Sequence, residues 1–372
     1  MDTQRLRRLQ DAVRTAGLDA LLLTNPKNVL YITGIAPMME GSVMPFHDPE
    51  YFALIQPERC DVLCDGRYIA EIKGRAGFTA NLLEAPVSAK VIGDKIKGLL
   101  SPSARNIGYE SDAMLHRDAI ALMEHLPAYT WKPAEQLPAD MRVIKSREEI
   151  ELIRKAQAIT GDAFGHMCKT IRVGMTEKQV ALAIGNYLRE HSEGNSFNPI
   201  VAFGETGAFP HYVPSPDRKL QKGQMVLLDF GGIYRGYCGD LTRMLVMGKA
   251  DARMREVYDM VLAAQQKCLD GLRPGKTCHE LDALCRDYFA SKGCADAFSH
   301  GTGHGVGLAI HEPPTLKRTF QNKVAPGMIV TIEPGLYFSG WGGVRIEDLV
   351  VITETGHENL TPTPKKLAEI DC

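Results

Sequence analysis

The sequence predicts an α/β fold in two parts, the second of which contains a duplicated α/β half. In the first part, the apolar runs DALLLT, YFALIQ and CDVLCDG alternate with stretches of helical periodicity, which is the pattern of an α/β domain. A polar, Pro-containing stretch over 133–141 precedes a charged helix that begins at Ser146. After this helix, one series of motifs occurs twice. We therefore place two domains at 1–142 and 143–372.

Composition and charge argue against several classes of function. The chain has 372 residues, 44% of them hydrophobic and 24% charged, with a net charge of −2, which argues against nucleic acid as a partner. The nine cysteines include no CxxC pair, and the first residues, MDTQRLRRLQ, are charged where a signal peptide is apolar. No apolar run approaches the ~20 residues of a membrane helix. We expect a reduced, cytoplasmic protein that does not bind membranes.

The first domain is predicted from its order of helices, strands and turns. An amphipathic helix over 2–16 leads into the strand DALLLT and a turn over 25–28. Further helices are expected at 67–74 and 88–100, between the later strands. The stretch 36–49 is rich in Met, Pro and Gly and has no period, which predicts a long loop.

The loop over 36–49 has two possible roles. Its Met38, Met39, Met44 and Phe46 are expected to be exposed, and Met and Phe are enriched in interface cores, so the loop is a candidate to reach the active-site mouth of a neighbouring subunit. The alternative is a surface loop without a partner.

The second domain repeats itself along the chain. Thr176 and Thr277 each begin a capping box, with Gln or Glu three residues later, and each opens a helix with apolar residues at helical spacing. Further on, HYVPS at His211 parallels HEPPT at His311, and GQMVLLDFG parallels GMIVTIEPG. A pseudo-twofold domain would place one hairpin from each half side by side.

Acidic residues occupy matched positions in these hairpins. The stretch VLLDFGGIYRGYCGDLTRMLV turns at Tyr234-Arg235-Gly236 and is predicted to bring Asp229 nearly opposite Asp240, where cross-strand Cβ atoms are ~4.5–5.5 Å apart. The second hairpin carries Glu333 and Glu347. Buried carboxylates at this separation are unfavourable unless they are paired or bound to a cation, and a divalent cation is the simplest solution.

With His304 from SHGTGHGVGL, these four carboxylates form a candidate site for two divalent metal ions. Taken singly, an acidic residue at a strand end is more often solvated, and a histidine among glycines is more often a turn residue. The matched positions in the repeat favour the metal site. The glycines at 301, 303, 305 and 307 lack the spacing of a dinucleotide-binding loop, so we expect them to allow close backbone approach.

These motifs resemble those of the metal-dependent peptidases with the pita-bread fold, which include methionine aminopeptidases, Xaa-Pro aminopeptidases, Xaa-Pro dipeptidases (prolidases) and the metal-free creatinases. The resemblance is carried by DFGG, GDLTR, HGTGHGVG, IEPG and RIED over about residues 145–360, and by NPKNVLYITG and CDGRY in the first domain. It implies a creatinase-like N-terminal α/β domain followed by a pseudo-twofold pita-bread catalytic domain.

The resemblance also implies a role for each site residue. One metal would be chelated by Asp229, the other held by His304 and Glu333, and both bridged by Asp240 and Glu347. Mn²⁺ is favoured by the oxygen-rich ligands, with Co²⁺, Zn²⁺ or Fe²⁺ as alternatives. The catalytic residues would be His211, His311 and Glu333, and the substrate would be bound by His211, His300 and Arg345. Arg345 lies two residues before Glu347, on the same strand face, so its alternative role is to orient a ligand carboxylate. For either histidine at 211 or 311, the alternative is a core residue bonded to a main-chain carbonyl.

By the same resemblance, the expected activity is hydrolysis of the Xaa-Pro peptide bond by a homodimer. A dipeptidase acting on Xaa-Pro dipeptides is slightly favoured over an aminopeptidase acting on longer proline-containing peptides, because the chain is short. Two alternatives remain: divergent chemistry on the same fold, as in metal-dependent sulfoniopropionate lyases, and a non-catalytic binding paralogue. The latter would be expected to have lost metal ligands, and this chain keeps all five.

Overall fold

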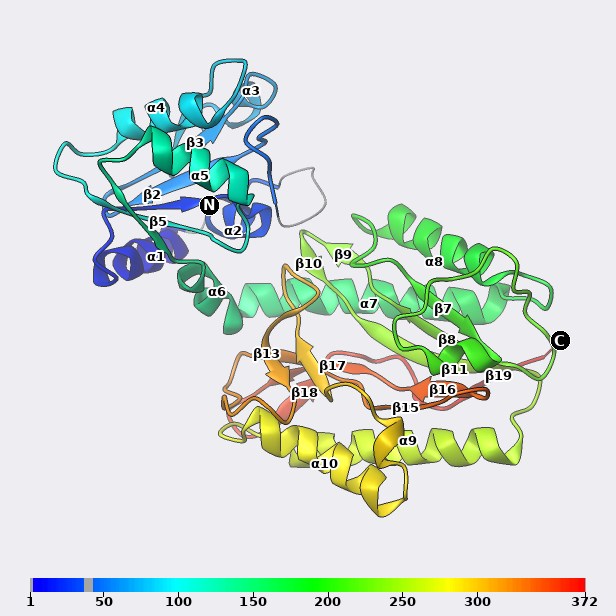
Figure 1. Cartoon of the computed structure of the whole chain (residues 1–372). Helices are drawn as coiled ribbons and strands as arrows, with labels where there is room; N and C mark the ends of the chain where they lie inside the picture. Colours follow the sequence, from blue (N-terminus) through cyan, green and yellow to red (C-terminus); the bar gives the residue numbers. More distant parts are fainter. Residues whose placement is uncertain (1–2, 37–42, 372) are drawn as a thin grey trace. The chain divides into compact units, whose positions relative to one another are not determined.

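The structure is a computed structural model that describes residues 3–36 and 43–371. It divides into two compact units, Met1–Arg142 and Val143–Cys372 (Figure 1). Both units mix helices and strands, which confirms the predicted α/β class. In the described part of the chain, no helix has the length and apolar character needed to cross a membrane.

The first unit is built on one mixed sheet of order β4-β3-β2-β1-β5-β6. Its strands are β1 (Ala20–Leu23), β2 (Phe52–Gln56), β3 (Arg59–Cys64), β4 (Thr79–Leu82), β5 (Asn106–Tyr109) and β6 (Thr130–Pro133). Its helices are α1 (Thr3–Thr15), α2 (Pro26–Thr33), α3 (Ile69–Ile72), α4 (Ala89–Leu99) and α5 (His116–His125), and α6 (Gln136–Val143) leads into the second unit.

Two details of the first unit differ from the prediction. The predicted turn over 25–28 is the start of α2: Asn25 caps the helix by accepting a hydrogen bond from the Lys27 N–H at 3.0 Å, and Pro26 takes the first helical position. Asn-Pro signals both a turn and a helix start, and here the apolar residues that follow extend the helix. The polar, Pro-containing stretch before Ser146, for which no helix was predicted, folds into α6.

The predicted exposure of Met44 and Phe46 is wrong. Both side chains are buried, with exposed fractions of 1% and 2%, in a core that includes Phe52 of β2. The Phe46 and Phe52 ring centroids are 5.4 Å apart, and Asp118 accepts a hydrogen bond from the Phe46 N–H. Burial within the unit stabilises these apolar side chains more than solvent exposure would. The predicted roles of Met38 and Met39 lie outside the described residues.

The second unit contains two sheets of order β19-β11-β8-β7 and β13-β12-β14-β17-β18, with two short hairpins, β9–β10 and β15–β16. Its first half comprises α7 (Arg147–Thr170), α8 (Glu177–His191), β7 (Ile200–Phe203), η1 (Gly204–Ala208), β8 (Met225–Phe230), β9 (Ile233–Tyr234), β10 (Tyr237–Cys238) and β11 (Leu241–Met247). The remainder comprises α9 (Ala252–Gly271), α10 (Cys278–Ser291), η2 (Ala295–Ala297), β12 (Gly303–Gly305), β13 (Glu312–Leu316), β14 (Ile329–Ile332), β15 (Gly335–Phe338), β16 (Gly342–Arg345), β17 (Asp348–Ile352), β18 (His357–Asn359) and β19 (Ala368–Ile370).

The strands of this unit lie between two pairs of helices, α7–α8 and α9–α10 (Figure 1). One core cluster joins α7 and α8 to the first sheet, through residues such as Ile184 and Leu228. Another joins α9 and α10 to the second sheet, through residues such as Leu281 and Val330. Each half of the repeat thus packs its own pair of helices on its own sheet.

Backbone contacts support the predicted duplication. Both predicted capping boxes are present, at Thr176 and Thr277. The same two residues form isolated β-bridges with Lys219 and Lys323. Each half thus ties the start of its second helix to the segment that leads into the strand with a predicted ligand, β8 or β14.

The first hairpin forms with a shifted register. Its tip is confirmed: β9 and β10 are joined by Arg235 and Gly236, whose φ angles of 48° and 80° suit a type I′ turn. Asp229, however, pairs with Thr242 of β11, and Asp240 lies two residues before Thr242, just outside this strand. The chain leaves the main ladder between β8 and β9 because Gly231 packs directly on the Gly239 carbonyl, which splits the predicted hairpin in two.

Candidate metal centre

One cavity of about 630 Å³ in the second unit gathers every site residue that the sequence predicted. It lies where the ligand-bearing strands of both halves end. Its lining includes His211, Asp229, Asp240, His300, His304, His311, Glu333, Arg345 and Glu347.

The repeat delivers the four carboxylates in pairs. Asp229 lies near the end of β8 and Asp240 directly precedes β11, whereas Glu333 directly follows β14 and Glu347 directly precedes β17. Strands β8 and β11 are antiparallel neighbours, as are β14 and β17. Asp229, Asp240 and Glu347 expose only 8%, 3% and 2% of their surface.

The structure brings three of the five predicted ligands within common reach of one ion. Ligand atoms of Asp240, His304 and Glu347 all lie within 4.8 Å of one another. The other two are turned toward cationic partners: Asp229 accepts a hydrogen bond from Arg345, and Glu333 Oε1 lies 3.1 Å from His304 Nε2.

Burial and mutual repulsion disturb the ionisation of these carboxylates. Burial, followed by the charges of Glu333 and Asp229, raises the pKa of Glu347 to about 8. Burial and the neighbouring Glu347 also raise the pKa of Asp240 well above its usual range. Burial raises the pKa of Asp229 despite Arg345 beside it.

His304 and Glu333 form an ion pair in the same cavity. Burial opposes a charged imidazole, but the hydrogen bond and charge of Glu333 outweigh it and raise the pKa of His304 to about 9. Burial likewise opposes the charge on Glu333, and His304 overcomes it, lowering the pKa of that carboxyl to about 2. His304 is therefore charged in the metal-free protein and has to lose a proton before it can bind a metal.

The residues present fit a divalent metal site. Asp240 is buried beside Glu347, and among the described residues no donor hydrogen-bonds to its carboxylate, whose contact is His304 Nε2 at 3.7 Å. Buried carboxylates in this state are unfavourable unless a cation compensates them. Carboxylate and imidazole ligands suit Mn²⁺, Co²⁺, Zn²⁺ and Fe²⁺.

A hydrogen-bonded shell around the ligands was not predicted from the sequence. Thr242 Oγ1 donates to Glu347 Oε2 at 2.7 Å and accepts from Arg345 Nε at 3.0 Å. The Tyr337 hydroxyl accepts from Arg345 at 2.8 Å and lies 2.8 Å from His300 Nε2. The position of Thr242, two residues after Asp240 and on the same strand face, is a sequence signal that could have revealed it.

Two buried glutamines extend this shell symmetrically. Gln157 of α7 donates to the Asp240 carbonyl at 2.8 Å and accepts from the Asp240 N–H at 2.9 Å. Gln265 of α9 donates to the carbonyls of Ile332 and Ile346, which directly precede Glu333 and Glu347. Each half of the repeat thus uses one helix glutamine to fix the backbone beside its ligands, as metal-site supports do.

The glycine run acts by close packing, as predicted. A Cβ atom on Gly303 would lie 1.9 Å from the Thr331 carbonyl oxygen. Glycine at this position therefore lets β12 approach β14 and place His304 beside Glu333.

The two predicted catalytic histidines also line the cavity. His311 lies against His304, with ring centroids 4.3 Å apart and ring planes at 71°. His211 follows Pro210, which lines the cavity as well. The two histidines come from equivalent loops of the repeat.

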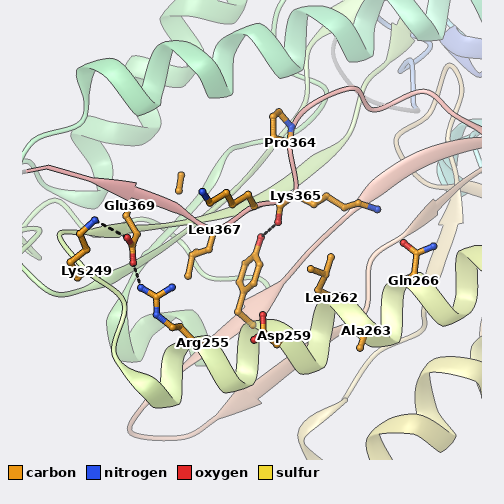
Figure 2. Close-up of a pocket in the computed structure, with 13 residues that line it drawn as sticks. Lys249, Arg255, Asp259, Leu262, Ala263, Gln266, Pro364, Lys365, Leu367 and Glu369 are labelled. Carbon is orange, nitrogen blue, oxygen red and sulfur yellow. Dashed lines mark hydrogen bonds and ion pairs between the residues drawn. The ribbon is translucent and has the colours of Figure 1, made fainter.

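A larger groove of about 1200 Å³ lies elsewhere on the second unit, between α9 and the C-terminal segment (Figure 2). Figure 2 shows Lys249 and Arg255 turned toward Glu369, which pairs with both. Lys365 pairs with Asp348 at 2.8 Å. The charges of this groove are largely compensated within the protein, so we place no chemistry there.

The shifted pKa values predict how the stability of the metal-free protein depends on pH. Glu347 titrates near 4.5 when unfolded and near 8 when folded, and His304 moves from 6.5 to about 9. The folded protein therefore binds more protons between pH 5 and 9, and its stability falls as pH rises through this window. Glu333 acts oppositely, but only below pH 4.5.

We expect the melting temperature in EDTA to decrease from pH 5 to 9, and a saturating divalent metal to reduce this dependence, since bound metal replaces the protons. Differential scanning calorimetry measures both. In the Glu347→Gln variant the side chain at this position cannot ionise, so its melting temperature in EDTA should decrease less between pH 5 and 9. A melting temperature that is constant or rises over this range would contradict the ionisation described above.

Comparison with known proteins matches both units of the chain to known domain families. Residues 151–354 match the model of metallopeptidase family M24, and residues 5–144 match the creatinase/prolidase N-terminal domain. The chain is 32% identical to an Xaa-Pro dipeptidase of Pyrococcus furiosus, over 98% of this chain and 99% of the relative.

Two solved structures are similar over nearly their full lengths. An Xaa-Pro dipeptidase from Bacillus anthracis has a TM-score of 0.89 and 34% identity, covering 98% of this chain and 99% of its own. An X-Pro aminopeptidase from Thermotoga maritima has a TM-score of 0.85 and 29% identity, covering 97% and 100%. With the two-unit fold and the family match over the cavity-bearing region, these similarities show that the chain belongs to metallopeptidase family M24, with a creatinase/prolidase-type N-terminal domain.

Proposed function

We propose that this protein is an Xaa-Pro peptidase that uses two divalent metal ions, and that dipeptides are its preferred substrates. The observation that carries the proposal is the convergence of four carboxylates and His304 in one cavity. The relatives include an Xaa-Pro dipeptidase and an X-Pro aminopeptidase, so they support both substrate classes.

Asp229, Asp240, His304, Glu333 and Glu347 would hold the two ions. When bound, the metals would supply Lewis-acid polarisation of the scissile carbonyl and acidify a water toward neutral pH. Glu333, at the cavity surface beside His304, would move the proton of the attacking water toward the leaving nitrogen.

The histidines flank this centre and take different roles in the proposal. His311, next to His304, would donate a hydrogen bond to the oxygen on which negative charge develops. His211 would orient the substrate backbone. His300 contacts Tyr337, which in turn accepts a hydrogen bond from Arg345, so these two predicted substrate-binding residues would act by holding the wall of the cavity.

The cavity lining includes apolar residues that would suit a proline ring. Phe197, Ile200 and Ile310 provide apolar surface beside His211 and His311. A proline nitrogen in a peptide bond carries no hydrogen, so a proline after the scissile bond needs no acceptor from the protein, and apolar lining residues would suit its ring.

The cation that would recognise a dipeptide is Lys317. In the cavity lining, Lys317 and Arg345 are the Lys and Arg side chains. Arg345 is 3% exposed and already donates to Asp229, Tyr337 and Thr242, so it is not available to a substrate. Lys317 follows β13 and is exposed, with no ion pair to another described residue, so it can pair with the C-terminal carboxylate of an Xaa-Pro dipeptide.

Lys317→Met is expected to raise KM for Ala-Pro about tenfold, the effect of losing one charge-assisted hydrogen bond. KM for Ala-prolinamide, which lacks the carboxylate, should change little. Steady-state kinetics on both substrates measures this, with Lys323→Met, outside the cavity lining, as the matched control. Equal effects on the acid and the amide would contradict carboxylate recognition.

Product analysis with Ala-Pro and Ala-Pro-Ala tests the activity itself. The proposal predicts release of alanine from the dipeptide and slower cleavage of the tripeptide. Faster release of alanine from the tripeptide would favour the aminopeptidase, and absence of cleavage of either peptide by the metal-loaded protein would refute the Xaa-Pro peptidase activity.

Three further features belong to the proposal. The ligand chemistry favours manganese as the native metal, the family resemblance favours a homodimer, and the composition favours a cytoplasmic location.

A further inference from the structure

We propose that the buried ion pair between Lys145 and Glu312 positions the turn that carries His311, so that Lys145 affects turnover through the placement of His311. The inference rests on the proposed role of His311 and adds a residue from the very start of the second unit. Lys145 and Glu312 are therefore positioning residues.

The ion pair is well removed from solvent. Lys145 Nζ lies 2.7 Å from Glu312 Oε1, and the two side chains are 1% and 6% exposed. Lys145 Nζ also donates to the Val143 carbonyl at 3.3 Å, and the Lys145 N–H donates to the Gly327 carbonyl at 2.9 Å. The lysine is thus fixed at both its backbone and its side chain, and its removal would take a buried cationic partner from the Glu312 carboxylate.

The carboxylate of Glu312 closes the turn over 306–311. Its Oε2 accepts a hydrogen bond from the Ala309 N–H at 3.4 Å. Gly307 packs so closely that a Cβ atom there would lie 2.3 Å from Glu312 Oε1. The Gly307 carbonyl in turn accepts from the Cys238 N–H at 2.8 Å, two residues before Asp240. The turn is therefore held between the ion pair and the other half of the repeat.

This turn determines where the His311 ring lies. His311 directly precedes Glu312, and its ring packs edge-on against His304 at 4.3 Å. If Glu312 loses Lys145, its carboxylate will turn toward other donors or water, and the turn will shift with it. Misplacement of a catalytic group by ~1 Å can reduce the rate by about 10²-fold.

The test uses Lys145→Met, which keeps the bulk of the lysine, with Lys145→Arg and Glu312→Gln. The matched control is Lys276→Met, which breaks the exposed Lys276–Glu280 pair at 2.9 Å in the same unit. In the metal-loaded enzyme acting on Ala-Pro, Lys145→Met should lower kcat about 10–100-fold with KM and metal content unchanged. Lys145→Arg should recover most of kcat, and Lys276→Met should match the wild type. A general loss of folding would instead lower metal content along with activity.

A double-mutant cycle with His311→Ala separates positioning from general damage. If Lys145 acts through His311, adding Lys145→Met to His311→Ala should reduce kcat little further. Independent multiplication of the two losses, or wild-type kcat in Lys145→Met, would overturn the inference. If His311→Ala alone keeps wild-type kcat, the proposed catalytic role of His311 is wrong. This result differs from those that would refute the positioning role of Lys145.

Amide hydrogen exchange on the metal-free protein gives a readout that does not depend on activity. Lys145→Met should speed exchange of the amides in 306–312, whereas Lys276→Met should leave them unchanged. Unchanged exchange in this turn of Lys145→Met would overturn the inference whatever the kinetics show. Glu312→Gln, which removes the same ion pair from the other side, should reproduce the effect.

Discussion

Replacing Asp240 by asparagine is expected to abolish hydrolysis of Ala-Pro because the metal centre no longer fills. Asp240 is 3% exposed and lies within ligand reach of His304 and Glu347. An amide oxygen carries no charge with which to offset two dications, so both ions should bind far more weakly. Inductively coupled plasma mass spectrometry after gel filtration measures the metal content beside steady-state kinetics.

The control for this variant is Asp287→Asn, an exposed acid of α10 outside the cavity lining. It should keep wild-type metal content and activity. High concentrations of Mn²⁺ should partly restore activity in Asp240→Asn if the lesion is one of affinity. Full metal occupancy with unimpaired turnover in Asp240→Asn would remove this residue from the ligand set.

Replacing His311 by alanine is expected to lower kcat by roughly 10²–10³ while both metals stay bound, the range typical of losing one donor to a developing oxyanion. His211→Ala should instead raise KM at least as much as it lowers kcat, if that histidine orients the substrate. The contrast between equivalent loops of the repeat is the informative result, because the two variants remove the same chemical group.

The same metal analysis and kinetics check the histidine variants, with thermal unfolding to confirm that each is folded. If His311 only fills space or binds metal, metal content or stability will fall together with activity. Near wild-type kcat in His311→Ala with both metals bound would show that the catalytic assignment is wrong, and the symmetry that suggested it would lose most of its weight.

The sequence predicted the fold class and the gathering of the site residues because both depend on local motifs. Strand-ending acids such as Asp229 and Glu333 recur at one register of the repeat, so two halves that fold alike must bring them together. The nine predicted site residues all line one cavity, while their roles remain predictions.

Features that depend on packing over long sequence separations could not be predicted. The hairpin register differs because Gly231 packs on Gly239, and periodicity carries no information about that contact. For Arg345 the sequence left two partners open, a ligand carboxylate and the substrate, and the structure shows the first, because Arg345 donates to Asp229, 116 residues away. Met44 and Phe46 looked like interface residues because composition alone does not distinguish an interface from a domain core.

Polar residues that support the site were missed for the same reason. Gln157 and Gln265 lie in helices with ordinary amphipathic patterns, and only the fold inserts them beside the ligand-bearing strands. Nothing in the sequence distinguishes Lys317 from other surface lysines, and only the structure shows that it lines the cavity. Searching the two halves for polar residues at equivalent buried positions would find the glutamines in other members of such a repeat.

Metal titration of Ala-Pro hydrolysis tests the central claim most directly. The protein is stripped with a chelator, the chelator is removed, and the rate of proline release is followed as Mn²⁺ is added to a known concentration of protein. We predict no hydrolysis without metal and a rise in rate that saturates at two equivalents per chain. Full activity of the stripped protein, or saturation at one equivalent, would contradict the dinuclear centre.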